Sequence, residues 1–145
     1  MIALLQRVSS AHVDVCGERI AAIGPGLLVF ACVQPGDTAA QIERMAERVL
    51  AYRVFADGDG KMNLGLKDSG GDLLLVSQFT LAADTKSGLR PSFSQAAAPQ
   101  EGRAGFEALV AACRARWSSV ATGQFGANMQ VGLVNDGPVT FWLET

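Results

Sequence analysis

Hydrophobic and polar residues alternate near the start of the chain. Residues 2–8 and 11–16 follow a period of two, and residues 19–23 resume it after a turn at residues 16–18. This period predicts three strands, each with one face toward a core. Residues 27–33 are continuously apolar, as expected for a strand that is buried on both faces.

Two later segments carry apolar residues at helical spacing. The first follows Thr38 and Gln41, which have the spacing of a capping box, and its apolar positions recur from Ile42 to Leu50. The second begins at Pro99, because proline is favoured in the first turn of a helix. Its apolar stripe consists of Phe106, Leu109, Val110, Cys113 and Trp117. Both helices are predicted to pack one face against a sheet.

The last part of the chain predicts an interrupted strand. Residues 129–133 alternate, residues 139–143 are largely apolar, and Gly137-Pro138 lies between them. Proline has no N–H for a central ladder, so we expect this pair to break the ladder or to lie at a sheet edge. A kink there would turn main-chain carbonyls outward. The order of elements predicts one mixed α/β domain, α+β-like, over residues 1–145.

The apolar run at residues 73–76 ends in an unexpected way. It passes directly into residues 77–81, which bring two hydroxyls, an amide and an aromatic ring to the end of a buried strand. Buried polar groups need partners, so these side chains bind either the neighbouring backbone or a ligand. The first candidate functional residues are therefore Ser77, Gln78, Phe79 and Thr80.

Composition and charge narrow the classes of function. Apolar residues make up 49% of the chain and charged residues 18%, which favours an interface between subunits. The formal net charge is −2 with no basic run, so any contact with nucleic acid has to be local. Three scattered cysteines fit a reducing cytoplasm better than a disulfide framework. We expect neither a signal peptide nor a membrane span.

The single histidine limits the catalytic options. His12 alternates with Val13 and is interpreted as facing solvent, so an enzyme with this sequence should work without a histidine base. There is no CxxC pair either, and we expect no metal site and no cofactor. Residues 57–60 start like a calcium loop, but Lys61 occupies a ligand position, so a hairpin turn is predicted instead.

A long loop follows the candidate site. It carries Lys86 and Arg90 and leads to Phe93. Two interpretations stay open: an ordinary solvated loop, or a rim that faces phosphate groups beside the site.

The chain resembles the D-aminoacyl-tRNA deacylases over its whole length. Two stretches carry most of the resemblance, Ser77-Gln78-Phe79-Thr80-Leu81 and Asn135-Asp136-Gly137-Pro138-Val139-Thr140, in the order and at the spacing of that family. The resemblance implies a mostly antiparallel, barrel-like sheet with two main helices packed on it, in a homodimer. The chain departs from the family at Gln124 and Asn128, where Arg and Asp are frequent, which changes two charges near Met129.

The resemblance also implies an activity. It implies a cytoplasmic enzyme that hydrolyses the ester between a D-amino acid and the 3′-terminal adenosine of tRNA, with mischarged glycyl-tRNA(Ala) as a second substrate. It further implies that Gly137-Pro138 is cis and reaches into the active site of the other subunit as a chirality filter. Substrate contacts are implied for Met129, Asn135, Val139 and Thr140.

An aminoacyl ester is already activated, so oxyanion stabilisation matters more than a strong nucleophile. Backbone N–H groups from Gln78 to Thr80 are the expected oxyanion donors. Thr80 has no base to activate it, and the resemblance points to the ribose 2′-hydroxyl of the tRNA as the assisting group. We therefore expect Ser77 and Thr80 to position the substrate rather than attack it.

Two other functions are compatible with the same residues. One is a dimeric module that binds RNA ends without hydrolysis. The other is an esterase or thioesterase for small molecules, which would hydrolyse simple esters that lack the adenosine. Deacylation of D-tyrosyl-tRNA separates the three hypotheses.

Overall fold

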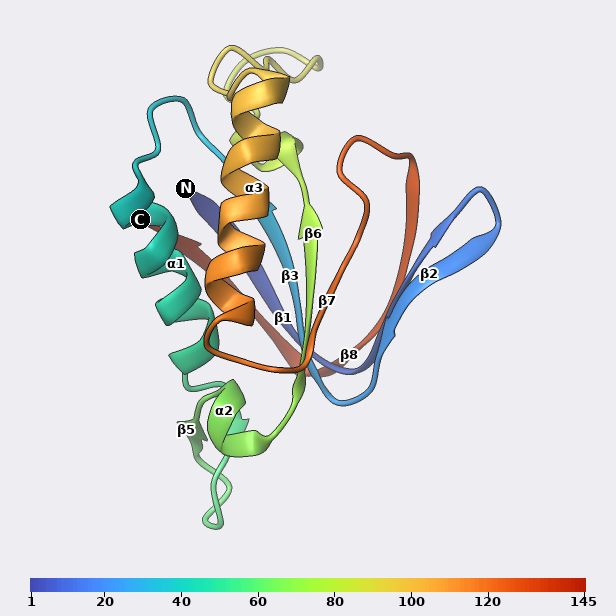
Figure 1. The fold of residues 1–145 in the computed structure, drawn as a ribbon, viewed down its shortest axis with the longest axis vertical. Coiled ribbons are helices and arrows are strands. Elements are labelled where there is room, and N and C mark those ends of the chain that lie inside the picture. The colour runs from blue at the N-terminus through green and yellow to red at the C-terminus, as the bar shows by residue number, and fades with distance from the viewer.

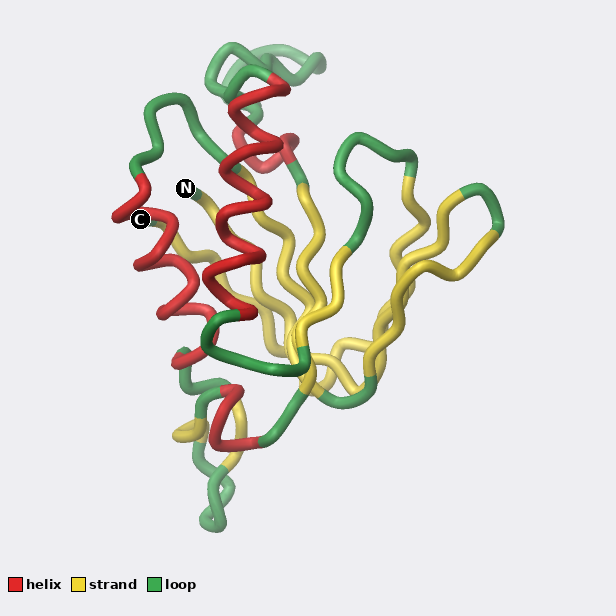
Figure 2. The backbone as a smooth tube through the Cα atoms, in the orientation of Figure 1, coloured by secondary structure: helices red, strands yellow, loops and turns green.

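The computed structural model describes residues 1–145, and strand β1 (Ile2–Val15) organises its central sheet. Along one edge β1 pairs with β8 (Met129–Glu144). Along the other edge it pairs first with β3 (Gly26–Cys32) and then with β2 (Glu18–Ile23). All of these pairings are antiparallel. Figure 1 shows the elements in place, and Figure 2 shows the same backbone coloured by secondary structure.

The remaining strands of the sheet are parallel. Strand β6 (Asp72–Ser77) pairs with β3, and β7 (Val120–Thr122) pairs with β6. The far halves of β1 and β8 bend away together with β2, so that the sheet curls toward a barrel (Figure 1). The expectation of a mixed α/β fold with a mostly antiparallel, barrel-like sheet is confirmed.

One predicted boundary is wrong. Residues 2–8 and 11–16 were expected to form separate strands, yet β1 is continuous from Ile2 to Val15. Ser9 and Ser10 interrupt the apolar alternation, but Ser10 still pairs with Val134 of β8. The two exposed serines mark the bend of a single strand, because main-chain pairing continues where the side-chain pattern stops.

Two long helices cover one face of the sheet. Helix α1 (Ala39–Ala51) begins with the predicted capping box between Thr38 and Gln41. Helix α3 (Pro99–Arg114) packs closely because Gly105 has no side chain: a Cβ there would lie 2.9 Å from the methyl groups of Val33. Trp117, predicted to belong to the stripe of this helix, lies beyond its end, and its Nε1 donates to the carbonyl of Gly71.

Smaller elements complete the chain. A short helix α2 (Leu66–Ser69) and the strand pair β4 (Phe55–Ala56) and β5 (Met62–Leu64) lie beyond the end of α1. The predicted hairpin turn between β4 and β5 is confirmed, and the Asp57 carboxylate accepts hydrogen bonds from the backbone of Asp59 and Lys61.

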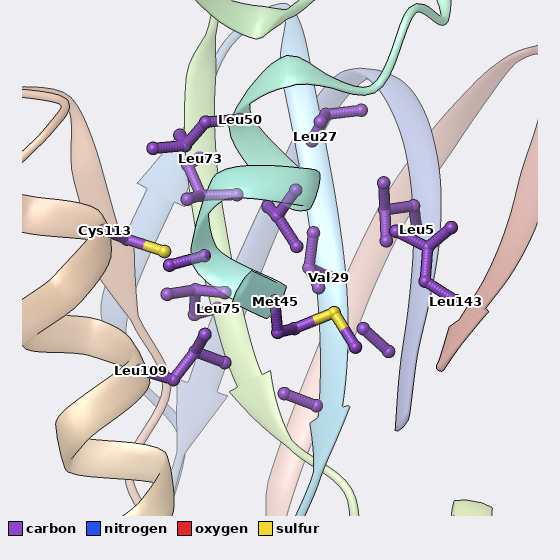
Figure 3. Close-up of a cluster of buried hydrophobic side chains, with 14 of the residues drawn as sticks. Leu5, Leu27, Val29, Met45, Leu50, Leu73, Leu75, Leu109, Cys113 and Leu143 are labelled. Atoms are coloured by element: carbon purple, nitrogen blue, oxygen red, sulfur yellow. The ribbon is translucent and has the colours of Figure 1, made fainter. Parts of the chain in front are cut away.

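The main core fills the space between the helices and the sheet. It comprises 23 buried residues, several of which appear in Figure 3, including Met45 of α1, Leu109 of α3 and Val29 of β3. A second cluster of six buried residues lies inside the curl of the sheet, including Val13 and Leu74. No helix of the structure is both long and apolar enough to cross a bilayer. Strands β3 and β6 pack in the helix-covered core, and their carboxyl ends lie at the candidate site.

Candidate active site

A cavity of about 620 Å³ lies at the carboxyl ends of β3 and β6. These neighbouring strands are parallel, so their last residues meet at the same edge of the sheet. The first half of α3 and the loop between β7 and β8 supply the other walls. Ligands of α/β proteins commonly bind outside the carboxyl ends of parallel strands, which makes this cavity the candidate site.

Three of the four residues predicted to be catalytic line this cavity. Ser77 and Gln78 are half-buried in its wall, and Phe79 lies at its mouth, 58% exposed and 5.1 Å from the ring of Phe93. Thr80 is exposed and does not line the cavity, but its Oγ1 accepts a 2.6 Å hydrogen bond from Nε2 of Gln78. Gln78 therefore links Thr80 to the cavity wall.

The chain turns out of the sheet immediately after Ser77. A 3-10 helix, η1 (Phe79–Ala82), replaces the strand, which explains why Phe79 and Thr80 are exposed and not buried as their neighbours suggested. The expected burial of Thr80 was therefore wrong, although its hydroxyl does have a partner, the Gln78 side chain.

The same turn decides which N–H groups are free. The N–H of Gln78 donates to the carbonyl of Ala31 at 2.8 Å, so it is unavailable as an oxyanion donor. The N–H groups of Phe79 and Thr80 open the 3-10 helix and have no backbone acceptor, as is usual at the start of a helix. The predicted set of three donors is thus reduced to two.

A glycine shapes the opposite wall. Met129, at the start of β8, lines the cavity, and a Cβ at Gly123 would lie 2.8 Å from its Sδ.

Asn128 also lines the cavity, whereas Gln124 is exposed and outside it. Of the two positions that depart from the family pattern, only Asn128 therefore faces the site.

Cys32 is the only ionisable side chain that lines the cavity. Burial raises the pKa of its thiol, so the group is neutral near pH 7. His12 lies elsewhere, across the β1–β8 ladder from Gly132 and 3.8 Å from the carboxylate of Asp14. The cavity therefore offers hydroxyl, amide and main-chain groups, as expected for a site without a histidine base.

The second sequence motif forms a bulge in β8. Gln6 pairs with Thr140 and Val8 pairs with Asn135, so residues 136–139 leave the ladder opposite Arg7. The Asn135 side chain closes the bulge: its Oδ1 accepts from the N–H of Val139 at 2.8 Å, and its Nδ2 donates to Oγ1 of Thr140 at 2.9 Å. The predicted break in the ladder is confirmed.

The bulge contains the expected cis bond between Gly137 and Pro138. Gly137 has a φ of 138°, a value that residues with a side chain rarely adopt. A Cβ there would also lie 2.6 Å from Cγ2 of Val139 and 3.1 Å from the Arg7 guanidinium. Only glycine fits this position.

Arg7 is a residue that sequence reasoning missed. Its Nε donates to the carbonyl of Asp136 at 3.0 Å, and its Nη1 donates to the carbonyl of Val54 at 2.6 Å. The guanidinium thus fixes the bulge to the segment that follows α1. The only signal in the sequence is an arginine within an apolar strand, which does not reveal its partners 47 and 129 positions away.

The two motifs lie apart within one chain. Gly137 and Pro138 are exposed, and neither lines the cavity. Arg7, at the bulge, pairs with Leu27 near the start of β3, whereas the cavity lies at the end of β3. Five strand residues cover about 16 Å. Of the predicted substrate-binding residues, Met129 lines the cavity, whereas Asn135, Val139 and Thr140 belong to the bulge.

The fold is a mixed α/β domain with a cavity at the ends of two parallel strands and a main-chain bulge on its surface. The model of the D-Tyr-tRNA(Tyr) deacylase family matches residues 4–144. The chain therefore belongs to the D-Tyr-tRNA(Tyr) deacylase family.

Similar proteins agree with this assignment. A D-aminoacyl-tRNA deacylase of Azotobacter vinelandii is 62% identical, and one of Stenotrophomonas maltophilia is 61% identical, each over 99% of both chains. Among solved structures, a c-Myc DNA unwinding element binding protein is 38% identical with a TM-score of 0.95, covering 100% of this chain and 99% of its own. A probable eukaryotic D-amino acid tRNA deacylase, 18% identical, has the same fold, with a TM-score of 0.86 and 99% and 98% coverage.

Proposed function

We propose that this protein hydrolyses the ester bond of D-aminoacyl-tRNA and releases free tRNA and the D-amino acid. The observation that carries the proposal is the cavity at the ends of β3 and β6, where Ser77, Gln78 and Phe79 lie beside two N–H groups without acceptors. Family membership favours this chemistry over that of a simple esterase. Mischarged glycyl-tRNA(Ala) is a second substrate, and the cytoplasm is the expected compartment.

The N–H groups of Phe79 and Thr80 form the proposed oxyanion hole. They are adjacent at the start of η1, so both can point at one oxygen as the ester carbonyl becomes tetrahedral. One such donor typically contributes about a hundredfold to a thousandfold in rate. The only ionisable side chain that lines the cavity is Cys32, and burial raises the pKa of its thiol, so the cavity wall offers no side-chain base and the tRNA 2′-hydroxyl assists the attacking water. Ser77 and Thr80 position the substrate.

The site is completed by a second copy of the chain. The bulge at Gly137-Pro138 is held by Arg7 and Asn135 and faces outward, and it is offset from the cavity of its own chain by about 16 Å along the strand direction alone. Exposed apolar side chains, Trp142 on β8 and Phe79 at the cavity, give a second copy apolar surface to cover. In a symmetric homodimer both copies make the same contact, so if one bulge lies at the partner's cavity, the other does too. This arrangement completes both sites.

In this dimer the Gly137 and Pro138 carbonyls bind the α-ammonium of the amino acid. Main-chain atoms then occupy the position that an L side chain would need, while a D side chain points away. Rejection by backbone does not depend on side-chain type, so it suits an enzyme that accepts many D-amino acids and glycine. Asn135, Val139 and Thr140 hold this filter, and Met129 forms the wall for the terminal adenosine.

Hydrolysis of D-tyrosyl-tRNA and L-tyrosyl-tRNA by the purified protein tests the proposal. We expect rapid release from the D substrate, slow release from the L substrate, and strong loss of rate when the terminal ribose lacks its 2′-hydroxyl. Binding without release would instead indicate an RNA-end-binding module. Equal hydrolysis of simple D-amino acid methyl esters would indicate a small-molecule esterase.

A further inference from the structure

A second hollow adjoins the cavity along the outer flank of α3. It measures about 420 Å³ and lies between α3 and the segment that follows β7. We call it the α3 groove and define it by Arg103, Phe106, Arg114, Thr122 and Phe125. None of the residues with a predicted catalytic or substrate-binding role lines it.

The groove adjoins the cavity across one aromatic ring. Phe106 and Phe125 line both hollows, and their ring centroids are 6.3 Å apart. The Phe125 ring therefore forms the partition between them. An extended ligand that has one end in the cavity would therefore run past the Phe125 ring into the groove.

The groove carries positive charge with free donors. The Arg103 guanidinium lies 4.9 Å from the centroid of Phe125, is 55% exposed, and has one long ionic contact of 3.8 Å with Glu107. Arg114 is exposed and has no ionic partner. Arginine binds phosphate through two parallel N–H groups, so both side chains are suited to phosphate. An aromatic ring beside arginine is also typical of surfaces that bind single-stranded nucleic acid.

The spacing of the two arginines suits a strand and not a single anion. Arg103 and Arg114 are eleven helical residues apart on α3, which corresponds to about 16 Å along the axis. This distance spans more than one nucleotide. The chain has a net charge of −2, so a local arginine pair is the kind of contact through which it can bind an RNA backbone.

We propose that the α3 groove binds the sugar–phosphate backbone of the single-stranded 3′ end of tRNA. In this arrangement the terminal adenosine enters the cavity, the nucleotides before it pass Phe125, and Arg103 and Arg114 contact their phosphates. The inference rests on the proposed deacylase function. It adds a surface that distinguishes a tRNA substrate from an isolated aminoacyl-adenosine.

The test compares two substrates, D-tyrosyl-tRNA and the 3′-ester of D-tyrosine with adenosine. The double variant Arg103→Gln, Arg114→Gln should raise KM for the tRNA substrate about tenfold with kcat unchanged, and should leave the adenosine ester within about twofold of wild type. The dependence of log KM on log salt should weaken by about 0.7 for each lost phosphate contact. Glu107→Gln, which removes a negative charge from the groove, should lower KM for tRNA.

Arg44→Gln is the matched control, because Arg44 is exposed on α1 and lines neither hollow. An unchanged KM for tRNA in the double variant would overturn the proposal, and so would an equal loss with the adenosine ester. A loss confined to Lys86→Gln and Arg90→Gln would also overturn it, by placing the strand along the 84–93 loop. If the wild-type protein hydrolyses neither substrate, the deacylase function itself fails, and the groove proposal fails with it.

Discussion

The segments 77–80 and 135–140 are both polar interruptions of apolar strands, but the structure treats them in opposite ways. After Ser77 the chain leaves the sheet, and the side chains of Ser77 and Gln78 line a cavity, while Gln78 also bonds to Thr80 outside it. At residues 136–139 the chain bulges and then rejoins the ladder, and its polar side chains bond to one another. The first segment keeps two N–H groups without backbone acceptors beside a cavity, whereas the second bonds its polar side chains internally and presents main-chain atoms on the surface. A polar segment that lines a cavity and a polar segment that displays its backbone therefore differ in where their side chains find hydrogen-bond partners.

The strongest way to break this contrast is Gly137→Ala. Alanine at this position cannot adopt a φ of 138° without strain, and its Cβ would lie 2.6 Å from Cγ2 of Val139. The bulge must therefore change shape. We expect the preference for D- over L-tyrosyl-tRNA to fall by about a hundredfold or more, by loss of transition-state contacts. The measurement is the ratio of the two deacylation rates.

Gly17→Ala provides the control for this variant. Gly17 also has a positive φ, 83°, but a Cβ there meets nothing within 4 Å. This variant should lose some thermal stability and keep its D/L ratio. An unchanged D/L ratio in Gly137→Ala would show that the bulge is not the filter.

A weaker perturbation of the same bulge is Arg7→Lys. The guanidinium donates to two carbonyls in different directions, whereas a single ammonium on a flexible stem cannot hold both in the same geometry. We expect the D/L ratio to fall by about tenfold. Arg53→Lys is the control, because Arg53 is exposed and bonds only to Asn63. If melting temperature falls while the D/L ratio stays constant, Arg7 acts on stability alone.

At the open segment, Thr80→Val should have a smaller effect. The change removes the hydroxyl that accepts from Gln78 but keeps the main-chain N–H of the proposed oxyanion hole. Single-turnover deacylation of D-tyrosyl-tRNA should fall less than about tenfold. Isolation of a covalent aminoacyl adduct on Thr80 would contradict a positioning role and would make this hydroxyl the nucleophile.

The smallest expected effect concerns Cys32 in the cavity wall. Because burial raises the pKa of its thiol, the fraction of reactive thiolate at any pH from 6 to 8 is lower than for an ordinary cysteine. Cys32→Ala should therefore keep the deacylation rate within about threefold, with no change in its pH profile. Iodoacetamide should modify the exposed Cys16 faster than Cys32. If an inflection in the pH dependence of the deacylation rate disappears in Cys32→Ala, the thiol has a chemical role.

Much of the fold follows from local patterns. Helix α1 begins at its capping box and α3 at its proline, because the signals for both starts lie within a few residues. Strand β7 and helix η1 escape prediction, since three or four residues are too short to show a period. The continuity of β1 through Ser9 and Ser10 escapes for another reason: it depends on pairing with a strand more than a hundred residues away.

The candidate site also has features that follow from local sequence and features that depend on tertiary structure. Ser77, Gln78 and Phe79 were identifiable because a polar run interrupts an apolar strand locally. The loss of the Gln78 N–H to Ala31 was not identifiable, because it depends on the pairing of β6 with β3. The position of Thr80 outside the cavity depends on a turn too short to predict. The clamp by Arg7 joins three distant segments, which only tertiary structure brings together.

The bulge at Gly137 and the flank of α3 share no residue and no secondary-structure element. Mutation can therefore act on one without the other. Under the two proposals above, side-chain changes along α3 alter RNA binding and leave the rejected handedness unchanged. Under the same proposals, substitutions on α3 would tune the choice of tRNA independently of the stereochemical selection at the bulge.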